Sequence, residues 1–250
     1  RPGAAQVPVE AELDRVRPVL AGLRAERPAG VVLSIDTRRA AVMRQALELG
    51  ADIINDVSAL TTDRESLKVA AGSNAAVILM HMTDEPARMN DAPRYDDVAL
   101  DVYDFLETRV EACVRAGVDR RRLIVDPGIG FGKLGTHNIA VLEQIALYHG
   151  LGCPIMLGVS RKGLSEEHQK LNPRDRLPAS YAMALHGLMH GVQMLRVHDV
   201  AETAQVVDLW RRLTAEVRTR ISPLPSKAAS PVKRRAGAFT SCKFSGDALA

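Results

Sequence analysis

Side chains that could bind a ligand follow six short apolar runs of this sequence, at the point where each run ends. They are Asp36, Asn55, Met80 with His81, Asp126, Lys162, and Arg196 with His198. A polar residue after one such run is more often a helix cap or a turn residue than part of a site. Six in series favour a binding site.

The polar groups at the run ends form two chemical sets. Asp36, Asn55 and Asp126 offer carboxylate and amide groups, which match the donor and acceptor edge of a flat heterocycle. The basic residues after the last two runs offer cations and hydrogen-bond donors, which suit a phosphate or pyrophosphate. We therefore expect a ligand that combines a polar heterocycle with an anionic leaving group.

The stretch from Leu123 to Lys133 combines a buried strand with a glycine-rich loop. Its apolar start predicts a strand with Asp126 at the tip, and Pro127 biases that residue towards extended geometry. The three following glycines let the backbone turn sharply and approach a ligand closely. An ordinary strand-to-helix turn is the alternative. The stretch is not a P-loop, because it lacks the Gly-Lys-Ser/Thr ending.

Apolar runs alternate with longer helical patterns, as in βαβ units with a parallel sheet. We expect six strands, at residues 31–35, 52–54, 75–80, 123–125, 154–157 and 192–195. We expect helices at residues 9–25, 40–49, 67–71, 98–116, 138–148, 179–190 and 201–217, with loops at 83–97 and 163–177. Short runs of Val, Ile and Leu suit strands that are buried on both faces.

Composition places the chain among ordinary globular proteins. Apolar residues make up 46% and charged residues 25%, and no run is long enough to span a membrane. Three widely spaced cysteines predict reduced thiols in the cytoplasm, and no signal peptide is recognisable.

The net charge of +3 is unevenly distributed along the chain. Residues 221–250 carry five Lys or Arg and one Asp, which leaves the remainder at −1. This balance gives no support for nucleic-acid binding by the folded part. We expect a folded domain over residues 1–218 and a disordered basic tail over residues 219–250, because the tail lacks apolar periodicity.

Six motifs in a fixed order carry a resemblance to one enzyme family. They are Ser34-Ile-Asp-Thr37, Asp52-Ile-Ile-Asn-Asp-Val57, Leu79-Met-His-Met82, Asp126-Pro-Gly-Ile-Gly-Phe-Gly-Lys133, Ser160-Arg-Lys162 and Arg196-Val-His-Asp-Val200. Together they resemble the dihydropteroate synthases of folate biosynthesis. The resemblance implies an α/β fold of the (β/α)8 barrel type, with six of the eight units in this chain. It also implies condensation of a dihydropterin pyrophosphate with 4-aminobenzoate, helped by Mg²⁺, in a cytoplasmic homodimer.

The resemblance also assigns roles to residues. Those expected to hold the pterin are Asp36, Asn55, Met80, Asp126, Phe131 and Lys162. Those expected to bind pyrophosphate are Arg1, Arg196 and His198. Lys162, Arg196 and His198 are the candidate catalytic residues, because they could neutralise charge on the departing pyrophosphate. The partners implied are small-molecule substrates, without nucleic acid or membrane.

Two departures from the family pattern keep alternatives open. The family's first two strands, with its metal-binding Asn, correspond to sequence before Arg1, so we expect no metal ligand in this chain and little synthase activity from these 250 residues. Gly163 stands where the family usually has Ser, a change expected to weaken the aminobenzoate side of the pocket. The alternatives are a non-catalytic paralogue that binds pterin or pairs with an intact subunit, and a pterin-dependent methyltransferase domain.

Overall fold

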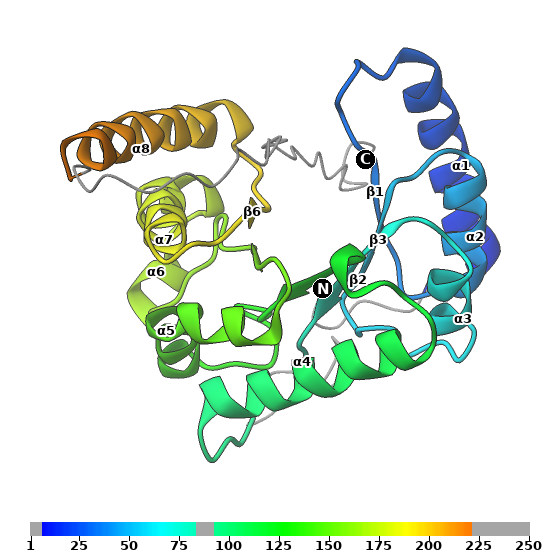
Figure 1. Ribbon diagram of the computed structural model, residues 1–250, viewed down its shortest axis with the longest axis horizontal. Helices are drawn as coiled ribbons and strands as arrows, with labels where there is room; N and C mark the ends of the chain where they lie inside the picture. The colour runs from blue at the N-terminus through cyan, green and yellow to red at the C-terminus, as the bar shows by residue number, and fades with distance from the viewer. Residues whose placement is uncertain (1–6, 84–92, 222–250) are drawn as a thin grey trace, which may run out of the picture.

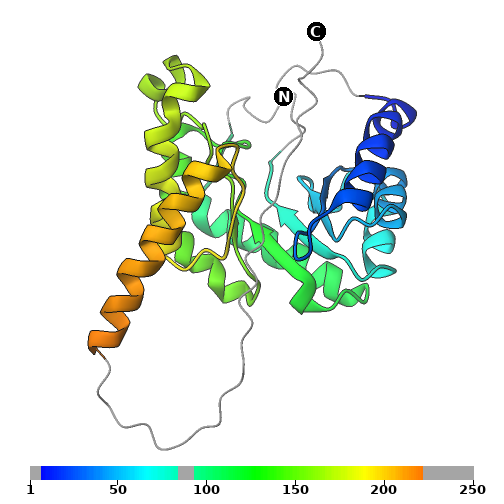
Figure 2. The same ribbon diagram turned by 90° about the horizontal axis from the view of Figure 1, so that it is seen from above.

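The computed structural model describes residues 7–83 and 93–221. Strands lie at the centre and helices surround them, with α1 to α4 around one half and α5 to α8 around the other (Figures 1 and 2). The strands are β1 (Ser34–Asp36), β2 (Ile53–Asp56), β3 (Ala76–Met80), β4 (Leu123–Asp126), β5 (Met156–Leu157) and β6 (Met194–Leu195). The six predicted strands are therefore confirmed, several of them shorter than the apolar run that predicted them.

The described α-helices match the predicted alternation, apart from one short helix in a region predicted as a loop. They are α1 (Val9–Glu26), α2 (Ala40–Glu48), α3 (Ser66–Ala71), α4 (Val98–Arg115), α5 (Gly135–Glu143), α6 (Glu166–Lys170), α7 (Leu177–Met189) and α8 (Val200–Ile221). In the described part of the chain, three 3-10 helices lie between them: η1 (Arg120–Arg122), η2 (Ile145–Leu151) and η3 (Pro173–Arg176). Asp97 begins α4 by accepting hydrogen bonds from the backbone N–H groups of Ala99 and Leu100.

Three sequence expectations need correction. The helix predicted over residues 138–148 begins three residues earlier and continues as the 3-10 helix η2, which ends at Gly152 in the left-handed conformation. The region predicted as a loop before residue 177 contains α6 and η3. The last helix, predicted to end at residue 217, runs to Ile221. The predicted tail beyond that helix lies outside the described residues.

All the strand pairs in the described chain are parallel and follow chain order. Strands β1 to β4 form one sheet and β5 with β6 a second, and a bridge between Val125 and Ile155 joins the two. Within the described residues, β1 and β6 each pair on one side only, so the sheet does not close there. The parallel α/β class that the sequence predicts is thus confirmed.

The core has two parts, one on each face of the sheet. The larger cluster lies between strands and helices and includes Ile54, Leu79, Leu123 and Val125. A smaller cluster on the opposite face takes its members from successive strands: Ile53, Ile78, Ile124, Met156 and Met194. Because side chains alternate across a strand, this inner cluster fixes which later residues share its face.

Candidate active site at the carboxyl ends of the strands

The inner core cluster defines the floor of the site. Residues two positions further along the same strands are Asn55, Met80, Asp126 and Arg196. A two-residue step returns the side chain to the same face of a strand, so these four lie one layer nearer the carboxyl ends. In (β/α)8 barrels that end of the strands carries the functional groups.

Strand register places the polar groups side by side. Asp36 pairs with Asn55 across β1 and β2, and Met80 pairs with Asp126 across β3 and β4. Asn55 is 3% exposed and Asp126 only 1% exposed. A carboxylate and an amide are therefore buried on one face of the sheet.

Arg196 lies between the two carboxylates of the site. Its Nη1 is 3.8 Å from Asp36 Oδ2, and its Nη2 is 3.6 Å from Asp126 Oδ2. Gly158 leaves room for this guanidinium, because a Cβ at residue 158 would lie 3.0 Å from Arg196 Nη2. Arg196, which the sequence assigned to pyrophosphate, thus also forms ion pairs with two acidic groups assigned to the pterin.

Among the buried acceptor atoms that make no hydrogen bond to the described residues are one from β2 and one from β4. They are Asn55 Oδ1 and Asp126 Oδ2. Burial of polar atoms without hydrogen bonds is costly, so such atoms are uncommon in folded proteins unless a ligand or water completes them. Both atoms match a ligand whose edge offers N–H donors.

The glycine-rich loop packs closely against the tip of β3. Gly128 has a φ of +69°, and a Cβ there would lie 2.0 Å from the carbonyl oxygen of His81. Glycine is therefore required, since other residues would be strained and would collide with backbone. The Gly128 N–H donates to Asp126 Oδ1 at 2.8 Å. The loop thereby fixes the carboxylate whose other oxygen lacks a hydrogen bond.

Lys162 and Phe131, both predicted to lie in the pocket, come together over this loop. The Lys162 ammonium lies 4.6 Å from the centre of the Phe131 ring and donates to the carbonyl oxygen of Ile129. A cation over an aromatic face is attracted by the ring's electron density. Asn138 of α5 supports the loop by accepting from the Gly130 N–H at 2.6 Å.

The Ser-Arg-Lys and Arg-Val-His-Asp motifs are joined to each other. Ser160 Oγ accepts from the His198 N–H at 3.1 Å and lies 3.0 Å from His198 Nδ1. Arg161 binds the Asp199 carboxylate with two N–H groups, at 3.0 and 2.6 Å. Hydrogen bonding to Arg161 lowers the pKa of Asp199. These contacts fix the loops after β5 and β6 relative to each other, and with them Lys162 and His198.

Asp56, which follows Asn55 in β2, is fully buried and holds the turn after the strand. Its carboxylate accepts from the N–H and hydroxyl of Ser58 and from the N–H of Leu60. Burial raises the pKa of Asp56 in spite of these bonds. The turn residues Ala59 and Leu60 both have positive φ, so Asp56 stabilises an unfavourable backbone beside the site.

Gly163 lies in the loop after β5, where there is no room for a side chain. A Cβ at this position would lie 2.8 Å from the Gln169 nitrogen, because α6 folds back over the loop. A serine would not fit this conformation. The short α6, which the sequence did not predict, therefore requires glycine at this position.

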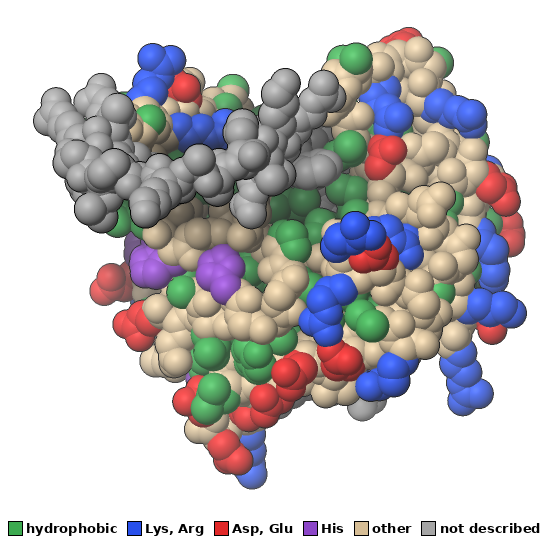
Figure 3. Space-filling view, viewed as in Figure 1, with side chains coloured by type: hydrophobic (Ala, Val, Ile, Leu, Met, Phe, Trp, Pro, Cys, Tyr) green, Lys and Arg blue, Asp and Glu red, His purple; other side chains and the backbone are tan. Residues whose placement is uncertain are grey.

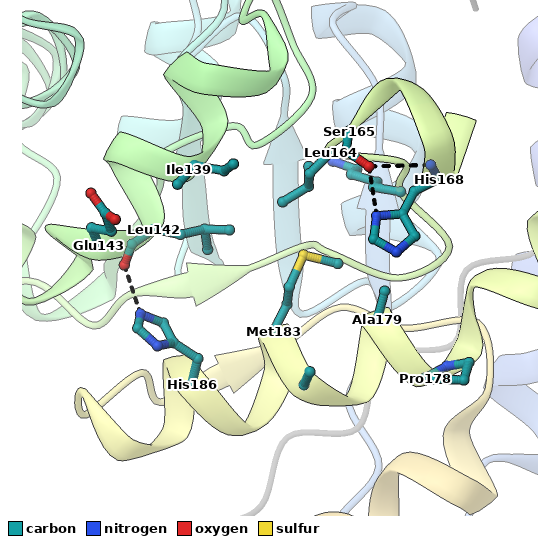
Figure 4. A pocket seen from close by; sticks show the side chains of 12 residues that line it. Ile139, Leu142, Glu143, Leu164, Ser165, His168, Pro178, Ala179, Met183 and His186 are labelled. Carbon is teal, nitrogen blue, oxygen red and sulfur yellow. Dashed lines mark hydrogen bonds between the residues drawn. The ribbon is translucent and has the colours of Figure 1, made fainter. Parts of the chain in front are cut away.

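An apolar pocket of about 640 Å³ lies beside Lys162, between α5, α6 and α7 (Figure 4). Ile139 and Leu142 line one side, and Met183 lines the other. His186 reaches across to the Leu142 carbonyl oxygen at 2.9 Å. Figure 3 shows histidine side chains gathered over the α6–α7 region of the surface, while Lys and Arg alternate with acidic groups over α1 to α3.

The structure thus brings together most of the residues assigned from the sequence. Asp36, Asn55, Met80, Asp126 and Arg196 share the inner face of the strands, and Lys162 with Phe131 covers the glycine loop. His198 is held by Ser160 beside them. Arg1 lies outside the described residues.

Four contributors to the site had no role assigned from the sequence: Asp56, Lys133, Asn138 and the Arg161–Asp199 pair. Lys133 offered a signal, as a single charge that closes a glycine and aromatic motif. Asp56, Arg161 and Asp199 stand inside quoted motifs, whereas Asn138 gave no local signal.

The described side chains offer few donors for a magnesium ion. Among residues 7–83 and 93–221, no three acidic, His or Cys side chains cluster so as to hold a metal ion. Asp36 and Asp126 both face Arg196, whose single positive charge offsets part of their negative charge. The described residues therefore do not form a metal site from protein ligands alone.

No helix in residues 7–83 and 93–221 is long and apolar enough to cross a bilayer.

The site combines buried carboxylate and amide acceptors with nearby cations at the carboxyl ends of parallel strands. This combination is typical of an enzyme site in a barrel-type fold that binds a polar heterocycle. The pterin binding enzyme family matches residues 1–198. The dihydropteroate synthase of Escherichia coli K12 is 40% identical over 207 residues, covering 83% of this chain and 72% of that protein.

Two solved structures of Xanthomonas albilineans dihydropteroate synthase are also similar. The structure with 4-aminobenzoic acid has a TM-score of 0.79 and 42% identity, covering 86% of this chain and 76% of that one. The structure in complex with 7,8-dihydropteroate has a TM-score of 0.77 and 40% identity, covering 84% and 76%. The chain belongs to the pterin-binding enzymes and, within them, to the dihydropteroate synthase family.

Proposed function

We propose that this chain acts as a dihydropteroate synthase, a transferase that joins a dihydropterin pyrophosphate to 4-aminobenzoate with release of pyrophosphate. The observation that carries the proposal is the pair of buried acceptors, Asn55 Oδ1 and Asp126 Oδ2, beside Arg196. A pterin offers ring and amino N–H donors along one edge, and these would satisfy both atoms.

The reaction can be followed on this chain's own residues. Asp126 and Asn55 hold the heterocycle, and the negative charge of Asp126 favours positive charge that develops on the pterin as pyrophosphate leaves. Arg196 and His198 neutralise the departing anion. The amine of 4-aminobenzoate then attacks the methylene carbon, so one C–O bond breaks, one C–N bond forms and a proton is released.

The aryl substrate would approach over the glycine loop. Lys162 and Phe131 form a cationic and aromatic wall there, with the Lys162 ammonium 4.6 Å from the centre of the Phe131 ring, which suits the flat ring of the pterin that the aryl amine attacks. Lys162 also borders the apolar pocket between α5 and α7, so a bulky aryl group has room beside it.

Binding is the primary test, because it uses only the described strand ends. Calorimetry should show saturable binding of a pterin and of 7,8-dihydropteroate. Turnover is measured as pyrophosphate release that depends on 4-aminobenzoate, with the product identified by mass. Methyl transfer without pyrophosphate release would indicate the methyltransferase alternative. Pterin binding without either reaction would indicate a non-catalytic pterin-binding protein.

Magnesium remains part of the proposal. Mg²⁺ is commonly bound through one or two carboxylates together with substrate phosphates, so a complete protein cage is not required. We expect the pyrophosphate substrate to bring most of its ligands. Chelation by EDTA should then weaken binding of the pyrophosphate ester and leave binding of the unphosphorylated pterin unchanged. Equal affinity for the ester with and without EDTA would contradict this role.

We also propose a homodimer that forms through the side of the molecule built by α5, α7 and α8 (Figure 1). Large apolar side chains are exposed there: Ile139, Leu185, Met189, Leu209 and Leu213. Such exposed groups favour an interface. Light scattering should show a dimer that becomes a monomer in Met189→Lys, while Val19→Lys on α1 stays dimeric. A monomeric wild type would refute the proposal.

The cytoplasm is the proposed location. Cys113 and Cys153 are both buried and form no disulfide. Burial raises the pKa of Cys113 to about 11 and also raises that of Cys153, so both remain protonated thiols. Unpaired cysteines suit a reducing compartment. Fractionation of the source cells should recover the protein with cytoplasmic enzymes, and recovery from a secreted fraction would contradict this location.

A further inference from the structure

A buried lysine lies beneath the glycine loop, and the reaction described above does not use it. Lys133 is 5% exposed. Its Nζ lies 2.8 Å from His81 Nδ1, 3.0 Å from the Gly128 carbonyl oxygen and 3.1 Å from the Phe131 carbonyl oxygen. An ammonium group has three N–H donors, so these three acceptors match it fully.

His81 is built to serve as an acceptor for this lysine. Its ring is buried and packs edge-on against Phe105, with centroids 4.9 Å apart. Its backbone N–H donates to the Asp126 carbonyl oxygen at 3.0 Å, which continues the pairing of β3 with β4. Burial, followed by the charge of Lys133, lowers the pKa of His81 to about 3. The ring is therefore neutral, and Nδ1 can accept the lysine's hydrogen.

The two carbonyl groups that Lys133 holds belong to residues that shape the pocket. Gly128 donates its N–H to Asp126 Oδ1, and Phe131 carries the ring beneath the Lys162 ammonium. The same two residues close the turn of the loop, because the Phe131 N–H donates to the Gly128 carbonyl oxygen at 3.0 Å. Movement of either carbonyl would thus displace the Asp126 carboxylate or the aromatic wall.

We propose that Lys133 is a positioning residue for the pterin site, whose ammonium group, held by His81, fixes the glycine loop so that Asp126 and Phe131 face the ligand. The inference rests on the proposed function, since it takes the ligand of Asp126 to be a pterin. In this role Lys133 does not contact the substrate and acts on pterin binding only through the glycine loop.

The surroundings of Lys133 make its charge sensitive to pH near neutrality. The groups around it are neutral His81 at the end of β3, anionic Asp126 at the end of β4 and cationic Lys162 after β5. Tyr95 contacts the same loop, where its hydroxyl donates to the Gly132 carbonyl oxygen. Burial lowers the pKa of Lys133 to about 7, Asp126 opposes this and Lys162 adds to it. Burial raises the pKa of Tyr95 to about 12, so Tyr95 stays neutral.

The direction of the pH effect follows from the donor count. As pH rises through the pKa of Lys133, the ammonium becomes an amine with two N–H donors for three acceptors, and Asp126 loses a nearby positive charge. The ordered loop therefore belongs to the protonated form. Pterin affinity should fall as pH rises, and pterin binding should in turn raise the pKa of Lys133.

Calorimetry with 6-hydroxymethylpterin between pH 6 and 8.5 tests the proposal, with Lys133→Met as the variant. We expect the variant to bind roughly tenfold more weakly at pH 6, as for loss of charge-assisted hydrogen bonds, and the gap to narrow towards pH 8.5. The ligand's own titration cancels in the ratio of the two affinities. Tyr95→Phe is the matched control, because it removes another loop contact, to the Gly132 carbonyl oxygen at 2.7 Å, without removing a charge. Its pH profile should parallel the wild type.

Hydrogen exchange of the wild-type loop keeps the inference testable if Lys133→Met fails to fold. After correction for intrinsic rates, peptides that cover residues 127–133 should lose protection between pH 6 and 8.5. A wild type that binds no pterin refutes the proposed function, and exchange then decides the role of Lys133 alone. Pterin binding with a constant affinity ratio and unchanged loop protection overturns the role of Lys133 and leaves the proposed function standing.

Discussion

Replacing Asp126 with Asn separates recognition of the pterin from stability of the fold. In the wild type, Oδ1 accepts from the Gly128 N–H at 2.8 Å, and Oδ2 has no hydrogen bond but lies 3.6 Å from Arg196 Nη2. The asparagine oxygen can keep the Gly128 bond. Its NH₂ group replaces Oδ2 and cannot accept a hydrogen from the ligand. The change therefore removes a charge-assisted hydrogen bond worth about 1.5–3 kcal/mol, or roughly a 10- to 150-fold loss of affinity.

Stability should change much less than affinity. Asp126→Asn loses attraction to Arg196 but also loses a buried charge that lacks a hydrogen bond, and these two effects oppose each other. We expect the free energy of unfolding to stay within about 1 kcal/mol of the wild type. Calorimetry with a pterin and urea unfolding measure the two quantities, with Asp208→Asn on the exposed face of α8 as the charge-matched control. A dissociation constant within twofold of the wild type would refute the recognition role. A large loss of stability would refute the claim that Asp126 serves pterin recognition more than stability of the fold.

Three further predictions concern the surroundings of the site. Gly128→Ala should lower the free energy of unfolding by more than about 1 kcal/mol, because residue 128 has a positive φ and its Cβ would collide with His81. Gly22→Ala in α1, where the added methyl group meets open space, should raise the free energy of unfolding by about 0.5–1 kcal/mol. Equal melting temperatures for the two variants would contradict the account of the loop. The hydrogen bonds from Arg161 lower the pKa of Asp199 in the folded protein. The pair therefore stabilises the fold at pH values above the pKa that this carboxyl group has in the unfolded chain. This stabilisation is lost as the pH falls through the pKa that Asp199 has in the folded protein. The melting-temperature difference between the wild type and Asp199→Asn should therefore shrink on acidification, and a constant difference would count against it. Lys162→Ala should weaken pterin binding by about 1.5–3 kcal/mol by calorimetry, and an unchanged dissociation constant would remove Lys162 from the pocket.

Residues at the strand ends were predictable because their signals are local. An apolar run followed by Asp126 and a glycine turn can be recognised within eleven residues. That Asn55 lies on the same face of β2 as Ile53 could also be predicted, because side chains alternate between the two faces along a strand. The type and order of the strands follow from such runs, although their exact ends depend on pairing with neighbours.

Other features depend on contacts between distant segments and were not predictable. Lys133 and His81 are 52 residues apart in sequence, and they come into contact only when β3 pairs with β4. Arg196 lies beside Asp36 and Asp126 because Gly158 leaves space for its guanidinium, a consequence of strand register that no local pattern reveals. The short α6 gave only a weak signal, since Ser165 as its cap precedes too few residues for a helical period to show.

The central claim is that the strand ends form a pterin pocket, and a crystal structure of the protein with a bound pterin tests it most directly. The account predicts N–H groups of the heterocycle within hydrogen-bond distance of both Asn55 Oδ1 and Asp126 Oδ2, with Lys162 and Phe131 against the ring. A pterin bound elsewhere, with these two acceptors still lacking hydrogen bonds to it, would contradict the claim.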